Sequence, residues 1–145
     1  MKWIAVYIKW IMLVSGALTA TMLYTAIAPH AAMQSNFGQT LEGPLAELIV
    51  RNWGLLVGLV GLMLIYGAFV PPARRLVLSV AALSKGVFVL LLLTVGKDYL
   101  GQTIRIAVVV DGLEALLFTA YLLTTRHAAR PPGADSQPPR ARSVA

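Results

Sequence analysis

Four long apolar stretches dominate the chain and limit what it can fold into. They cover about residues 3–28, 45–70, 76–95 and 104–123. A helix needs roughly 20 mostly apolar residues to cross a bilayer, and each stretch reaches that length. Of the 145 residues, 58% are hydrophobic and 12% are charged, whereas about 25% are charged in a soluble domain. The sequence therefore predicts an all-α integral membrane protein with four transmembrane spans.

The connections between the spans predict how they are arranged. Residues 71–75 and 96–103 are short links, so spans two, three and four are expected to be antiparallel neighbours. This favours an up-down helix bundle in one transmembrane domain, residues 1–125. The longer segment 29–43 is expected to lie on the membrane surface. Residues 126–145 are rich in proline and arginine and lack apolar periodicity, which is typical of a disordered basic tail.

The basic residues indicate an orientation in the membrane. Most of them fall at the start of the chain, between spans two and three, and after span four: Lys2, Lys9, Arg74, Arg75, Arg126, Arg130, Arg140 and Arg142. Because lysine and arginine are enriched in cytoplasmic segments, both termini are expected in the cytoplasm, with the protein in a bacterial inner membrane. This topology also explains the net charge of +6, so no nucleic-acid partner is predicted.

The N-terminal stretch has a second interpretation. Met1 and Lys2 resemble the charged start of a signal peptide, and the sequence 26–28, Ala-Ile-Ala, resembles its cleavage site. The apolar part is longer than an ordinary signal peptide requires. We therefore expect span one to be retained as a transmembrane helix.

Three charged residues interrupt the apolar spans: Lys85 in span three, and Asp111 and Glu114 in span four. With a rise of 1.5 Å per residue, Lys85 lies about 14 Å from one membrane face and Glu114 about 15 Å from the other, near the middle of a ~30 Å core. Asp111 precedes Glu114 by three positions and shares its helix face. The sequence therefore predicts that Lys85 bridges both acids.

A fourth charge, Arg51, lies at the outer end of a glycine stripe in span two. Gly54, Gly58 and Gly61 recur at helical spacing, and such small residues allow helices to approach closely. If Arg51 reaches inward to Asp111, the intramembrane charge cluster of Arg51, Lys85, Asp111 and Glu114 is neutral overall. A desolvated cluster favours such neutrality because uncompensated buried charge is costly.

The cluster has three interpretations. It is a polar lock that fixes the partners of spans two to four, a functional proton, ion or ligand path, because ionisable groups inside membranes are often functional, or a set of charges that pair between subunits or lie outside a misplaced span boundary. Span one also carries several hydroxyl groups, which are expected to hydrogen-bond to their own helix. They are Ser15, Thr19, Thr21, Tyr24 and Thr25.

The sequence lacks the residues that several kinds of catalytic and metal-binding site require. It has no cysteine, which excludes disulfides, thiolate nucleophiles and iron–sulfur ligation by this chain. No nucleophile–base pair, metal set or phosphate loop can be assembled from the sequence. We therefore predict no enzymatic activity, no cofactor and no metal.

Part of the chain resembles a known family. A glycine-rich second span that opens with residues 51–54, Arg-Asn-Trp-Gly, is followed by a turn, residues 71–75, that ends in two arginines. A basic residue midway along span three and acids in span four complete the pattern. Over about residues 50–123 this pattern is similar to the DoxX-like small bacterial membrane proteins. The resemblance implies an accessory membrane subunit, in some relatives associated with oxidoreductases that handle sulfur compounds or quinols.

These observations lead to two expectations about function. The first is a structural or accessory subunit of a membrane complex, whose partners are the lipid bilayer and either another membrane protein or a second copy of the chain. The alternative is a small carrier or proton-coupled channel component that uses Lys85, Asp111 and Glu114 as its ionisable path.

Overall fold

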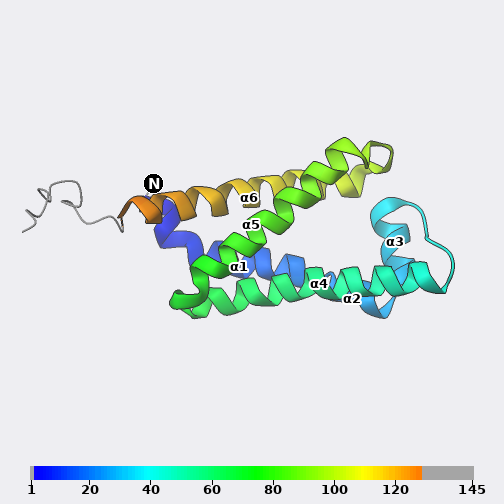
Figure 1. The fold of residues 1–145 in the computed structure, drawn as a ribbon, viewed down its shortest axis with the longest axis horizontal. Helices are drawn as coiled ribbons and strands as arrows, with labels where there is room; N and C mark the ends of the chain where they lie inside the picture. Colours follow the sequence, from blue (N-terminus) through cyan, green and yellow to red (C-terminus); the bar gives the residue numbers. More distant parts are fainter. Residues whose placement is uncertain (1, 129–145) are drawn as a thin grey trace, which may run out of the picture.

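A computed structural model describes residues 2–128, and Figure 1 shows the arrangement of their helices. The helices are α1 (Lys2–Ala20), α2 (Leu23–Ile27), α3 (Pro29–Phe37), α4 (Pro44–Phe69), α5 (Pro71–Thr94), the short 3-10 helix η1 (Lys97–Tyr99) and α6 (Gln102–Ala128). No strand occurs between residues 2 and 128. Four stretches are long and apolar enough to cross a membrane: Tyr7–Ile27, Pro44–Phe69, Pro71–Thr94 and Thr103–Thr125. The predicted all-helical fold with four helices of spanning length is confirmed.

The helix boundaries differ from the prediction in three places. Helix α5 begins at Pro71 rather than at residue 76, because proline is compatible with the first turn of a helix, where no backbone donor is needed. Helix α6 continues to Ala128, three residues into the predicted tail, while residues 129–145 lie outside the described part of the chain. The segment 29–43 contains a helix, α3.

The first span is interrupted between α1 and α2. The backbone N–H groups of Thr21 and Met22 bond to the carbonyls of Leu18 (3.2 Å) and Thr19 (3.1 Å), each three residues earlier. This spacing is the tighter one of a 3-10 turn rather than that of an α-helix. The break lies where the span packs against the glycines of α4.

Glycines bring α1 and α2 very close to α4. Gly54, Gly58 and Gly61 are buried on the face of α4 that meets the first span. A Cβ atom at Gly61 would lie 2.4 Å from the backbone nitrogen of Ala20, and one at Gly58 would lie 2.4 Å from the side chain of Leu23. Both distances are shorter than real Cβ atoms tolerate. A side chain at Gly61 would therefore require the helix backbones to move apart, and one at Gly58 would require the Leu23 side chain to move.

An arginine closes the corner between α4 and α5. The side chain of Arg74 donates hydrogen bonds to the carbonyls of Gly67 (3.3 Å) and Ala68 (3.1 Å) in the last turn of α4. Carbonyls at the end of a helix lack partners within the helix, and a basic side chain there also interacts favourably with the helix dipole. This contact stabilises the short connection at Val70.

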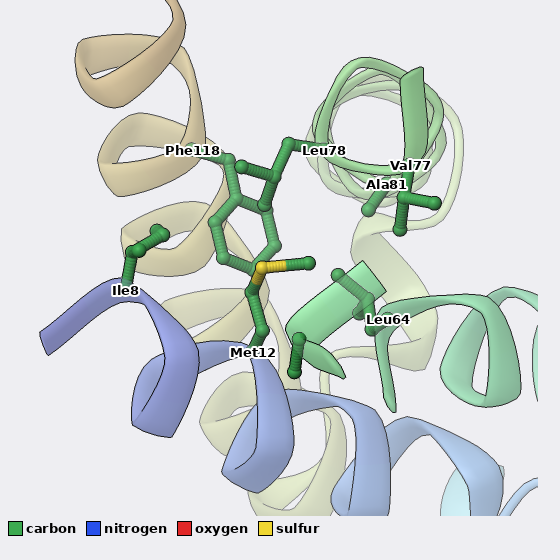
Figure 2. Packing of buried hydrophobic residues seen from close by; sticks show 8 residues of the cluster. Ile8, Met12, Leu64, Val77, Leu78, Ala81 and Phe118 are labelled. Atoms are coloured by element: carbon green, nitrogen blue, oxygen red, sulfur yellow. The ribbon is translucent and has the colours of Figure 1, made fainter. Parts of the chain in front are cut away.

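The hydrophobic core lies at the end of the molecule that contains this corner, which we call the closed end. Four helices contribute to it: Ile8 and Met12 from α1, Leu64 and Ala68 from α4, Val77, Leu78 and Ala81 from α5, and Phe118 from α6. Figure 2 shows Met12 and Phe118 side by side among the other core residues. Met12, Leu64, Leu78, Ala81 and Phe118 are each 0% exposed. The closed end is thus fully packed.

The opposite end, which we call the open end, is arranged differently. There α1, α2 and α4 form one packed unit and α5 with α6 form another. In Figure 1 α5 rises away from α4 toward this end, α6 runs along the opposite side of the molecule from α4, and α3 lies between α4 and the connection from α5 to α6. Helix α3 contacts both α4 and α6. It therefore bridges the two units where they are furthest apart.

Candidate functional site

A polar cluster, which we call the Lys85 cluster, consists of Lys85, Asp111, Glu114, Ser15 and Thr19. Lys85 lies at its centre, one helical turn beyond core residue Ala81 on α5. Its side chain is 7% exposed. The ammonium nitrogen Nζ donates to Asp111 Oδ1 at 2.5 Å and to Thr19 Oγ1 at 3.1 Å, and it lies 2.8 Å from Glu114 Oε2. The structure therefore brings Lys85 and both acids together, with the lysine between them.

The two acids come from one face of α6, as their spacing of three residues requires. Glu114 Oε2 also accepts a hydrogen bond of 2.7 Å from Ser15 Oγ. Among the described side chains, those of residues 7–101 and 103–125, no donor reaches the second carboxylate oxygen of either acid, Asp111 Oδ2 or Glu114 Oε1. Each carboxylate thus keeps one oxygen that can accept a further hydrogen bond.

Two hydroxyl groups of α1 complete the cluster, and sequence reasoning assigned them wrongly. Ser15 and Thr19 were expected to bond to their own helix, but they bond to Glu114 and Lys85. Both are buried, whereas Thr21 does bond to its own helix, at the Leu18 carbonyl. The missed signal is the spacing: residues 15 and 19 are four apart and share one helix face.

Arg51 does not join the cluster, contrary to our expectation. Its guanidinium pairs with Glu47 (2.6 Å), one turn earlier on α4. It also donates to the carbonyls of Ala26 and Ile27, at the end of α2, where helix carbonyls lack partners. Because its guanidinium is held by these partners, Arg51 stabilises the C-terminal end of the first span instead of neutralising Asp111.

The absence of Arg51 changes the charge of the cluster. Lys85 contributes one positive charge, and Asp111 and Glu114 contribute two negative charges when ionised. The formal sum is negative by one, not zero as expected. Such an excess is costly in a site of low dielectric unless something positive compensates it.

A cavity of about 680 Å³ begins at the cluster and extends toward the open end. Its walls come from both packed units: Leu18, Thr19, Thr21, Met22, Trp53, Leu56, Val57 and Val60 on one side, and Ser84, Lys85, Val87, Phe88, Leu91, Thr103, Ile104, Ile106, Ala107, Val110, Asp111 and Glu114 on the other. Glu114 lies one turn before core residue Phe118, so the cluster separates the cavity from the core. Most of the wall is apolar, and the charges gather at its inner end.

Helix α3 closes the far end of the cavity. Asn36 and Phe37, its last two residues, contribute to the lining. The ring of Phe37 packs against Trp53 of α4 with centroids 6.2 Å apart and planes tilted by 55°, a favourable aromatic arrangement. Gly38 ends the helix with a φ of 68°, a conformation that glycine adopts without strain. The cavity is therefore bounded by charge at one end and by aromatic rings at the other.

The arrangement suits binding better than covalent chemistry. Among the described residues, no three histidine or acidic side chains are grouped so that they could hold a metal ion. The functional groups of the cavity are one ammonium, two carboxylates, several hydroxyls, the amide of Asn36 and the indole N–H of Trp53. These groups can recognise a polar head, while the apolar walls can hold an apolar body.

No protein-family model, curated protein or solved structure matches this chain. The resemblance to DoxX-like proteins therefore stays a prediction from the sequence pattern.

Proposed function

We propose that this chain is a multi-pass membrane protein that binds a small amphipathic molecule between its helices, in the manner of a small carrier. The observation that carries this proposal is the cavity of about 680 Å³ with an apolar wall and the Lys85 cluster at its inner end. Volumes of about 300–1,000 Å³ are typical of small-molecule sites. A purely structural ion pair would not require such a space beside it.

The membrane assignment is supported by what the helices expose. Large apolar side chains cover their outer faces: Ile27, Leu45, Leu76, Leu83 and Leu116 are each more than 60% exposed. Contiguous apolar surface of this kind suits lipid rather than water. In the proposed topology the spans run up and down in turn, with both termini in the cytoplasm of a bacterial cell, as the basic residues predict.

The interruption between α1 and α2 agrees with a carrier. Leu18, Thr19, Thr21 and Met22 surround the break and also line the cavity. Irregular backbone at membrane depth is tolerated mainly where it lines a cavity or is buried in protein, and carriers often place broken helices at their binding sites. The break in the first span therefore lies at the proposed binding site, as it does in such carriers.

A binding assay with matched variants tests the proposal. The purified protein in lipid nanodiscs is titrated with phenylbutylamine, phenylbutanol and phenylbutyrate by calorimetry, with empty nanodiscs as the blank. Ala107→Trp fills the cavity, whereas Val109→Trp places the same large side chain at an exposed position of α6. We expect saturable binding of at least one probe to the wild type and to Val109→Trp, and none to Ala107→Trp. Absence of saturable binding of all three probes to the wild type would overturn the proposal.

A second assay separates a carrier from a static binding protein. Proteoliposomes are loaded with a fluorescent or labelled form of whichever probe binds, and its release is followed with time. We expect faster release from wild-type vesicles than from vesicles with Ala107→Trp. Equal release would remove the carrier part of the proposal and leave binding.

A specific observation also favours the accessory-subunit function. The apolar segment of α6 is the least buried of the four spans. Only 6% of its residues are buried, against 28% in each of the other three spans. A span with so few buried residues has a face available for another helix. The test is purification from native membranes in mild detergent. A stoichiometric partner that Leu116→Trp releases and Leu83→Trp retains would support this function, because the two leucines are equally exposed, at 69%.

A further inference from the structure

The inner end of the cavity offers hydrogen-bond acceptors but few donors. The Lys85 ammonium has three hydrogens, and three oxygens, of Thr19, Asp111 and Glu114, already surround its nitrogen within 3.1 Å. By contrast, one oxygen of each carboxylate has no donor in the described part of the chain. A ligand that donates hydrogen bonds therefore has charged acceptors here, whereas one that only accepts them meets neutral donors such as the Thr19 hydroxyl.

The charge of the site also favours a ligand that donates hydrogen bonds, and specifically one with a positive charge. With both acids ionised the cluster is formally negative by one unit, and Arg51, the cation expected to balance it, is held by Glu47 and by the carbonyls at the end of α2. Of the described residues that line the cavity, Lys85, Asp111 and Glu114 are the ones that carry charge. An anion would thus meet a net repulsion, whereas a single positive charge would make the site neutral.

The remaining walls determine the body of the ligand. Beyond the cluster the lining is mostly aliphatic and aromatic, with Val57, Phe88 and Leu91 among its members. An inorganic cation would leave most of the 680 Å³ unfilled. An apolar body attached to the charge would fill this space and displace poorly held water.

We infer that the cavity binds an organic monocation, a protonated amine whose nitrogen lies against the carboxylate oxygens of Asp111 and Glu114 that Lys85 does not contact, and whose apolar body extends toward Phe37 and Trp53. This inference rests on the proposed function, since it names the ligand class of the same site. The amine donates to the free carboxylate oxygens and supplies the missing positive charge. The hydroxyls of Ser15 and Thr19 keep the acids and the lysine in place.

The three probes share one apolar body and differ in the head group, so their comparison isolates the charge. We expect phenylbutylamine to bind at least about tenfold more tightly than phenylbutanol, because a hydrogen bond to a charged group is worth more than a neutral one. Phenylbutyrate should bind most weakly. Binding of the alcohol or the acid as tightly as the amine, still abolished by Ala107→Trp, would overturn the inference and leave the proposed function standing.

Charge variants identify the acids that are responsible. Glu114→Gln and Asp111→Asn each remove one negative charge and keep the shape of the side chain, so each makes the cluster neutral. We expect each to weaken binding of the amine about tenfold and to change binding of the alcohol less than about twofold. Asp98→Asn removes an exposed acid of η1 outside the cavity and should leave both affinities unchanged. An equal loss of amine affinity in Asp98→Asn, or no loss in either cavity variant, would contradict the inference.

Folding of each variant is checked by its thermal unfolding and by its binding of phenylbutanol. A variant that retains the alcohol and loses the amine has a folded cavity with an altered charge. If Glu114→Gln does not fold, Asp111→Asn decides the question, because Asp111 lacks the additional bond from Ser15. A proton that neutralises the cluster in place of a ligand would appear as equal affinities for the amine and the alcohol, which is the contradicting result.

Discussion

The closed and open ends of the molecule are built from the same helices but are packed in opposite ways. At the closed end α1, α4, α5 and α6 meet around side chains that are 0% exposed, such as Met12 and Phe118. At the open end the same helices form two units with a cavity of about 680 Å³ between them. The Lys85 cluster lies at the boundary. The charges therefore mark the depth at which the packed core ends and the cavity begins.

The largest effect is expected from Lys85→Met, which removes the cation from this boundary. Two acids would remain partly buried without their partner, and breaking a buried ion pair on one side costs about 3–5 kcal/mol. Thermal unfolding in nanodiscs measures the loss. The triple variant Lys85→Met, Asp111→Asn, Glu114→Gln should regain most of it, because no unpaired charge remains. If Lys85→Met is as stable as the wild type, the cluster does not hold the helices together.

One substitution made at both ends compares them directly. Phe118→Ala in the core should cost about 3 kcal/mol, because large-to-small changes in a packed site leave a void. Phe88→Ala, in the cavity wall, should cost less than about 1 kcal/mol, since its ring already faces an open space. Unfolding of the two variants under identical conditions gives the difference. Equal losses would mean that the open end is as tightly packed as the core.

The contact between α1 and α4 is expected to resist even one methyl group. Gly61→Ala would place a Cβ 2.4 Å from the Ala20 backbone, and such overpacking costs about 1–3 kcal/mol. Gly58→Ala should cost less, because its nearest neighbour is the flexible side chain of Leu23. In the described residues nothing lies within 4 Å of a Cβ at Gly86, so Gly86→Ala should be neutral or slightly stabilising. The reverse order of stabilities would refute the close approach.

The smallest effect concerns the hydroxyl groups at the boundary. Ser15→Ala removes one hydrogen bond to a charged group, worth about 1.5 kcal/mol. Ser79→Ala removes a bond to the carbonyl of Arg75 on an exposed face and should change stability by less than about 0.5 kcal/mol. Matching values for the two variants in the same unfolding assay would show that Ser15 does not support Glu114.

The helices and the pairing of Lys85 with the acids follow from the sequence because they depend on regular geometry. A fixed rise per residue gives Lys85 and Glu114 matching depths, and an offset of three residues gives Asp111 and Glu114 one face. The glycine stripe of α4 likewise indicates a close helix contact. Each of these inferences uses one helix or two, and none needs the global packing.

The partners of Arg51 and the cavity could not be predicted in the same way. Arg51 donates to the carbonyls of Ala26 and Ile27, which lack helix partners because α2 ends at Ile27. Helix α2 is short because the first span is interrupted near Thr21, and no glycine or proline marks that break. The cavity depends on the angle between two helical units, which arises from all their contacts together. Only the spacing of Ser15 and Thr19 was a readable signal that the prediction did not use.

Cysteine labelling tests directly whether the closed end is packed while the open end contains an accessible binding space. The chain has no native cysteine, so single variants report one site each. We predict that Ala107→Cys, in the cavity wall, reacts with a small cationic methanethiosulfonate and is protected by phenylbutylamine, whereas Ala81→Cys, at a position 0% exposed, does not react. Equal reaction rates at the two sites, or no reaction at Ala107→Cys, would contradict the difference in packing between the closed and open ends.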